Sequence, residues 1–179
     1  MKSRGFSCVA MALVLGLVVS AASADLAMYS QDFEGMELPV DGSTALSDDG
    51  WLVFGNIFDP GGGYLYGYGP FGAPNNASSP AFSNVTTGEG GPDQGDRQLA
   101  VFSDYNSPEH GNGNLVESNV YQEWIIGASD VGSTWTFSFD AKRGDLVPPS
   151  TALAFIKTLD PNNGFALTNF LTVTTDTLP

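Results

Sequence analysis

The clearest structural pattern in the sequence is Ser133-Thr134-Trp135-Thr136-Phe137-Ser138-Phe139-Asp140-Ala141-Lys142. Aromatic residues alternate here with polar residues. Successive side chains of a β-strand point to opposite faces, so this alternation puts three rings on one face and polar groups on the other. We therefore expect a strand whose Trp135 lies in a core and whose polar face meets solvent.

Comparable short aromatic and β-branched runs recur along the chain, separated by segments rich in Gly, Asn, Ser, Thr and Pro. This composition is typical of strands joined by turns. Further strands are predicted at residues 28–33, 51–58, 98–102, 119–126, 152–159 and 165–175, with a hairpin turn at residues 160–164. Residues 59–80 and 88–96 are Gly-rich and are expected to be long loops. The predicted class is all-β, with antiparallel strands.

The N-terminus has the three parts of a secretory signal peptide: Lys2 and Arg4, an apolar run at residues 9–19, and small residues at 22–24. We expect a signal peptide at residues 1–24, a single domain at residues 25–179 and a secreted protein, either extracellular or periplasmic. The apolar run is too short to span a bilayer, so no membrane insertion is expected. Cys8, the only cysteine, lies within this leader, so no disulfide is expected.

The chain is acidic, with 20 Asp and Glu against 6 Lys and Arg, a formal charge of −14. Such a charge repels phosphate groups and argues against nucleic acid, anionic lipid and acidic polysaccharide as partners. Neutral sugars and divalent cations remain admissible. The acidity is equally typical of a surface that only keeps a secreted protein soluble.

Residues able to carry out catalysis are scarce. His110, the single histidine, lies in a Gly- and Asn-rich stretch, and no HExxH, GxSxG or P-loop pattern is present. A non-catalytic protein is therefore expected. The enzymatic alternative is a glycoside hydrolase with two facing carboxylates drawn from Glu117, Glu123 and Asp140.

Aromatic residues provide candidates for sugar binding, because their rings stack on the apolar faces of sugar rings. Tyr64, Tyr66 and Tyr68 alternate with other residues in a Gly-rich run, which would place three rings on one side if the run is extended. Trp51 and Trp124 are further candidates. For all five, packing within the protein is the alternative to ligand contact.

Several short motifs follow one another in a recognisable order. They are Gln31-Asp32-Phe33-Glu34, then Trp51, then Gly95-Asp96-Arg97-Gln98-Leu99-Ala100-Val101, then Tyr121-Gln122 leading to residues 132–142. In this order the chain resembles the secreted jelly-roll domains of the carbohydrate-binding-module and galactose-binding-like group. The resemblance implies a β-sandwich of two antiparallel sheets. Because the chain stops after a strand-like run, we expect its closing strands to be missing.

The same resemblance implies a non-catalytic module that binds neutral polysaccharide or a cell-surface glycan, with a structural calcium ion. Glu34 matches the family's first-strand acid, and Asp96 and Arg97 match its mid-chain calcium loop. Asp32 is chemically suitable as a further oxygen ligand. The last-strand carboxylate of the family has no counterpart here, and solvated acids are the alternative for all three carboxylates. A structural or adhesive surface protein is the alternative function.

Overall fold

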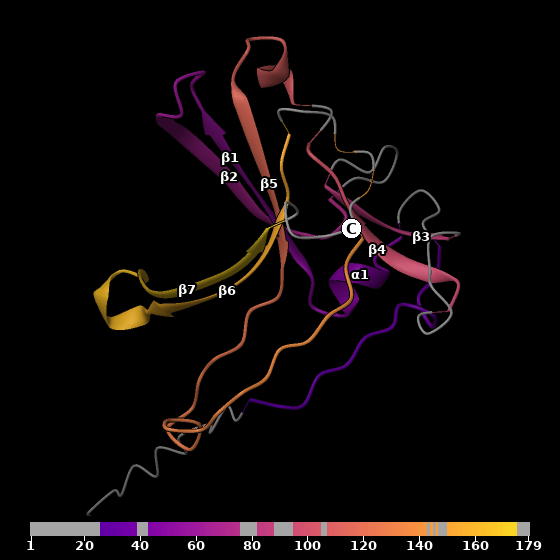
Figure 1. Cartoon of the computed structure of the whole chain (residues 1–179), viewed down its shortest axis with the longest axis vertical. Coiled ribbons are helices and arrows are strands. Elements are labelled where there is room, and N and C mark those ends of the chain that lie inside the picture. Colours follow the sequence, from indigo (N-terminus) through magenta and orange to yellow (C-terminus); the bar gives the residue numbers. More distant parts are fainter. Residues whose placement is uncertain are drawn as a thin grey trace, which may run out of the picture. The chain divides into compact units, whose positions relative to one another are not determined.

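The computed structural model describes residues 26–38, 43–75, 82–87, 95–104, 107–142, 144, 146 and 150–174. The predicted signal peptide therefore lies outside the described residues, as does most of the predicted loop at 88–96. Contacts within the chain divide it into two compact units, residues 1–131 and 132–179. Every strand pairing is antiparallel, which confirms the all-β class (Figure 1).

The first unit contains two sheets. The elements in order are α1 (Ala45–Asp48), β1 (Leu52–Phe58), β2 (Tyr64–Gly72), β3 (Ser83–Thr87), β4 (Arg97–Val101), the 3-10 turn η1 (Pro108–His110) and β5 (Leu115–Tyr121). Three strands form a sheet in the order β2-β1-β5, and β3 pairs with β4. No helix in the described part of the chain has the length and apolarity needed to cross a membrane.

Strand β1 defines the two faces of the three-stranded sheet. Its residues alternate regularly between buried and half-buried, with Val53, Gly55 and Ile57 buried. We call this side the inner face. The opposite side, which carries Phe54 and Asn56, is the outer face.

The inner face covers the core of the first unit. A buried apolar cluster joins both sheets and α1: Met36, Leu46, Val53, Ala73, Phe82 and Val85. Phe82 and Val53 are at most 1% exposed. Burial of side chains of this size contributes about 1.5–3 kcal/mol each, so this cluster holds the two sheets together.

Several predicted element boundaries differ from the structure. Residues 28–33 form no ladder in the described chain, and segment 98–102 shifts by one residue to become β4. The strand predicted at 119–126 instead covers Leu115–Tyr121, because β5 pairs with β1 along its whole length and stops where β1 begins, at Leu52. Strand β3 was not predicted.

The predicted loop at residues 59–80 contains strand β2, so that prediction is wrong. The Gly-rich sequence of β2 has few β-branched residues, which hid its strand character. This segment becomes a strand because it pairs with β1. A tight turn joins β1 to β2, and in it Asp59 Oδ1 accepts hydrogen bonds from the amides of Gly61 and Gly63. Residues 76–80 lie outside the described part.

The second unit is built on one hairpin, β6 (Leu153–Asp160) and β7 (Ala166–Thr174), joined by the 3-10 turn η2 (Pro161–Asn163). Asp160 accepts a 2.9 Å hydrogen bond from the amide of Asn162, and Gly164 adopts a left-handed conformation with φ 59°. The predicted turn at residues 160–164 is confirmed. Its Asp-Pro-Asn-Asn-Gly sequence supplies both the cap and the left-handed residue.

Residues 133–142 are not part of a ladder, which corrects the strand prediction made for them. Trp135 is 46% exposed, so it does not lie in a core, and Phe137 stacks on Phe139 with ring centroids 5.1 Å apart. Alternation alone gives a segment two different faces. A strand also needs a partner for its backbone groups, and none of the described strands pairs with this segment.

Candidate functional site

The three tyrosines of β2 do not share one face. Residues 64–66 contain a register shift, so that Tyr66 is opposite Ile57 while Tyr64 is opposite Phe58. A bulge of this kind adds one residue to a strand and reverses the alternation of its side chains. Tyr66 and Tyr68 therefore lie on the inner face of the sheet, and Tyr64 lies on the outer face.

Contacts on each side agree with this assignment. The Tyr68 ring lies over Gly55 and packs edge-on against Phe82, with centroids 6.0 Å apart. The Tyr64 ring instead packs against Phe58 on the outer face, 5.7 Å between centroids. The expectation of three rings on one side is wrong because the run is not regularly extended.

The hydroxyl groups of the two inner-face tyrosines are used within the protein. Tyr68 donates to Asp104 Oδ2 at 2.6 Å, and Tyr66 donates to Glu109 Oε1 at 2.9 Å. Burial, then the Asp104 carboxylate, raises the pKa of Tyr68; for Tyr66 the hydrogen bond to Glu109 is the main cause of a raised pKa. These bonds tie Asp104 and η1 to β2, so these phenols serve the structure.

The Nε2 atom of His110 is used in a backbone contact. Its Nε2 lies 2.8 Å from the carbonyl oxygen of Asp104 and 3.5 Å from Ser103 Oγ. A carbonyl oxygen only accepts, so Nε2 is the donor of the short contact and has no lone pair available for the serine. The contact instead closes the turn between Asp104 and η1.

The outer face carries a line of polar side chains that crosses from β1 to β5. Asn56 donates through Nδ2 to Glu117 Oε1 at 2.7 Å, and Asn119 donates through Nδ2 to the same oxygen at 3.0 Å. Asn56 and Glu117 are directly opposite in the register of the two strands. We call these three residues the amide–carboxylate row.

Aromatic rings lie beside this row. Gly67 of β2 has no side chain, and the Phe54 ring and the Tyr64 hydroxyl occupy the space where its Cβ would lie, on the outer face. Tyr64 is 61% exposed, whereas Phe54 and Phe58 are half-buried. The outer face thus combines an exposed ring, supported by two phenylalanines, with amide and carboxylate groups.

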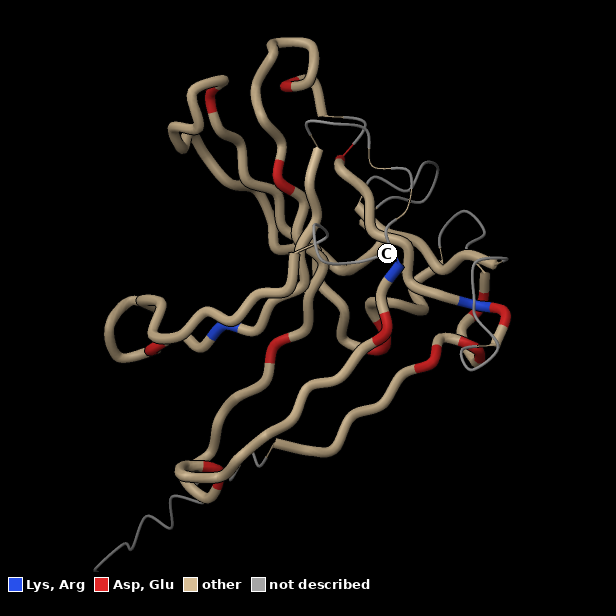
Figure 2. Tube along the Cα trace, viewed as in Figure 1, with Lys and Arg blue, Asp and Glu red and all other residues tan. Residues whose placement is uncertain are grey.

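No lysine or arginine occurs in β1, β2 or β5, as their sequences show and as Figure 2 displays along the trace. The Glu117 carboxylate therefore has only neutral amides as close partners within the row. An anion approaching this face would meet uncompensated negative charge.

The two tryptophan candidates have different surroundings. Trp51 packs against Phe33, with centroids 6.0 Å apart, and borders the core, so the packing alternative describes it. Its Nε1 donates to Asp49 Oδ2, which also accepts from Tyr29 and Gln31. This shared carboxylate attaches the N-terminal described segment to the end of α1.

Trp124 is 51% exposed and lies just beyond β5, beside Tyr29, with ring centroids 5.6 Å apart. Gln122 connects the same region, donating to the Tyr29 hydroxyl at 2.9 Å and to the Asp49 carbonyl at 2.8 Å. Burial, then the bond to Asp49, raises the pKa of Tyr29 to about 12. Trp124 is therefore a ring available to a ligand, separate from the amide–carboxylate row.

Of the predicted metal ligands, the structure brings Glu34 to the loop that contains Asp96. Glu34 Oε1 accepts a 2.5 Å hydrogen bond from the amide of Arg97 and lies against Gly95, so the first acid does meet the mid-chain loop that contains Asp96. The Arg97 guanidinium donates to the carbonyl of Met36, and Asp32 accepts from the amide of Glu34. Among the described residues, no three acidic, histidine or cysteine side chains gather as a metal cluster.

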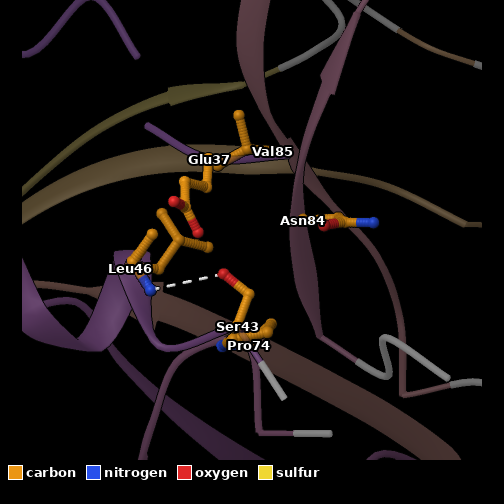
Figure 3. A pocket seen from close by; sticks show the side chains of 7 residues that line it. Glu37, Ser43, Leu46, Pro74, Asn84 and Val85 are labelled. Carbon is orange, nitrogen blue, oxygen red and sulfur yellow. Dashed lines mark hydrogen bonds between the residues drawn. The ribbon is translucent and has the colours of Figure 1, made fainter. Parts of the chain in front are cut away.

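A small hollow in the first unit, large enough for about one water molecule, is lined by Glu37, Ser43, Leu46 and Val85 among others. Figure 3 shows the Asn84 amide pointing away from Glu37 and Ser43, while the Ser43 hydroxyl is held by the Ala45 amide. The hollow is too small for a sugar ring. Binding at the outer face would have to use an open surface.

Comparison with known proteins gave no match among family models, curated proteins or solved structures.

The sequence pattern does not indicate Asn56 or Asn119 of the amide–carboxylate row, and it indicates Glu117 only as a candidate catalytic acid. Asn56 and Glu117 are 61 positions apart, so their contact depends on the register between β1 and β5. The available signal was weak: in Leu115–Tyr121, the polar residues Glu117 and Asn119 alternate with Val116, Ser118 and Val120.

Proposed function

We propose that this protein is a secreted, non-catalytic module of the jelly-roll β-sandwich type that binds neutral carbohydrate on the outer face of its three-stranded sheet. One observation carries the proposal: an exposed tyrosine ring, Tyr64, lies on the same sheet face as two amides and a carboxylate. Rings that stack on a sugar and polar groups that bond to its hydroxyls are the two components of such a site.

Charge supports a neutral ligand. The chain has a formal charge of −14, and the three strands of the site contain no basic residue. Nucleic acid and acidic polysaccharide would lack a counter-charge there. Trp124, exposed beside Tyr29, would be a second point of contact on a long glycan.

A structural calcium ion belongs to the proposal at Glu34, with Asp32 and Asp96 as the other carboxylates. Carboxylate oxygens suit calcium, and Glu34 lies at the loop that the resemblance assigns to the ion. Arg97 already links this loop to residues 34–36 through two hydrogen bonds. Calcium would strengthen a connection that the chain makes with its own groups.

A structural or adhesive role is the second candidate, favoured by the exposed apolar side chains of the β6–β7 hairpin. Phe165, Leu167, Phe170 and Leu171 are all more than half exposed. Exposed apolar side chains of this size are available for contact with another macromolecule. The glycoside hydrolase alternative has less support, because the Glu117 carboxylate already accepts hydrogen bonds from two amides.

The test is a pull-down of the secreted protein with insoluble glucan, mannan, galactan and xylan, with and without EDTA. The substitution Tyr64→Ala should weaken binding about tenfold, which corresponds to the loss of roughly 1.4 kcal/mol of stacking. Tyr66→Ala is the matched control, because Tyr66 is 45% exposed on the other face. Folded protein that binds none of these glycans would exclude the proposal, and an EDTA effect would support calcium.

A further inference from the structure

The hydrogen-bonding directions in the amide–carboxylate row are fixed by chemistry. An ionised carboxylate only accepts, so the nitrogen side of both amides must face Glu117. Asn119 Nδ2 also donates to the Phe54 carbonyl at 3.3 Å, which uses its second N–H. Neither amide can rotate by 180° without placing an oxygen against an oxygen.

The row is consequently rich in acceptors. Asn56 Oδ1, Asn119 Oδ1 and Glu117 Oε2 receive no hydrogen bond from any described residue, and Asn56 retains a single unused N–H. A complementary ligand must bring donors to at least two of these oxygens. Asn56 and Glu117 are directly opposite on neighbouring strands, so both residues present their remaining acceptors on the same face of the sheet.

We propose that the amide–carboxylate row recognises sugar hydroxyls as hydrogen-bond donors, so that the outer face selects uncharged sugars with adjacent free hydroxyls. This inference rests on the proposed function and deepens it. An O-methylated sugar presents acceptors where the protein also has acceptors, leaving oxygens on both sides unbonded. A carboxylated sugar adds repulsion from Glu117, with no basic residue on the three strands to offset it.

The experiment uses dextran, β-1,3-glucan, mannan and galactan, each in three forms: native, O-methylated and carboxymethylated. Binding of the whole protein to each form is measured by affinity electrophoresis or calorimetry at low and high salt. Native polymers that bind should lose at least tenfold in affinity on O-methylation. Carboxymethylated polymers should bind at least as weakly as O-methylated ones. High salt should restore part of their affinity, because it screens the repulsion between their carboxylates and Glu117.

The substitution Glu117→Gln removes the charge, and should narrow the gap between native and carboxymethylated polymers several-fold. Asp48→Asn is the matched control, because it makes the same charge change on α1, which packs against the inner face of the same unit. If O-methylated and native polymers bind equally, the inference is wrong while the proposed function stands. If folded protein binds no native polymer, both are wrong.

Discussion

The ring of Tyr68 lies directly over the backbone of Gly55 on the neighbouring strand, in space that any side chain at position 55 would occupy. The ring cannot easily move aside, since its hydroxyl is bonded to Asp104 and its edge meets Phe82. Gly55→Ala should therefore destabilise the first unit by about 1–3 kcal/mol, as overpacking does. Urea unfolding measures this change. Gly35→Ala, where an added Cβ has no neighbour within 4 Å, should leave stability nearly unchanged.

The Tyr68 hydroxyl should matter more than the Tyr66 hydroxyl. Asp104 is only 8% exposed, so Tyr68→Phe leaves a buried carboxylate without that donor, at a cost of about 1–3 kcal/mol. The hydrogen bond between Tyr66 and Glu109 is exposed, so water replaces it in Tyr66→Phe. Thermal denaturation of both variants compares them. Equal destabilisation would contradict the burial of the Tyr68–Asp104 hydrogen bond.

Glu109 should give the η1 segment a pH-dependent contribution to stability. Hydrogen bonds from Asn112 first, then Asn114 and Tyr66, hold the pKa of Glu109 below its usual 4.5. A depressed folded-state pKa means that the contribution is present above 4.5 and is lost as pH falls through the lower folded value. The difference in Tm between wild type and Glu109→Gln should therefore exist at neutral pH and disappear in acid. A difference in Tm that stays unchanged in acid would contradict this.

Tyr29 should lose its phenol proton at a higher pH than an ordinary tyrosine, and absorbance can follow this. Burial is the main cause that raises the pKa of Tyr29 to about 12, and its hydrogen bond to the Asp49 carboxylate is the second. Because the folded value is raised, the associated stability is complete below pH 10 and declines as pH rises toward 12. Ultraviolet difference titration should show one high-pKa phenol that is absent in Tyr29→Phe. In Asp49→Asn its pKa should fall but stay above the ordinary value.

Local signals predicted the parts of the fold that depend on local sequence. Strand β1 follows from its run of aromatic and β-branched residues, and the β6–β7 hairpin follows from its turn residues. Strand β2 could not be predicted in the same way, because its Gly-rich run becomes a strand only through pairing with β1. The same applies to the faces of its tyrosines. The bulge that separates Tyr64 from Tyr66 depends on register, which single-strand periodicity does not contain.

The candidate site was predictable only in its aromatic part. Tyr64 was identified, whereas Asn56 and Asn119 act through contacts with a strand far away in sequence. Trp135 shows the opposite error: its alternating neighbours predict burial, yet it is 46% exposed. Residue type and the alternation along a strand indicate which side chains could form a site, but the pairing between strands decides which of them come into contact.

The most direct test of the central claim is a nuclear magnetic resonance titration of the isotope-labelled protein with neutral glucan, mannan and galactan oligosaccharides. The side-chain NH₂ signals of Asn56 and Asn119 report on the outer face, and the backbone amides of η1 report on the side where Tyr66 and Tyr68 lie. We predict that at least one oligosaccharide shifts both side-chain signals and leaves the η1 amides unchanged. Shifts confined to η1, or no shift with any oligosaccharide, would contradict carbohydrate binding at the outer face.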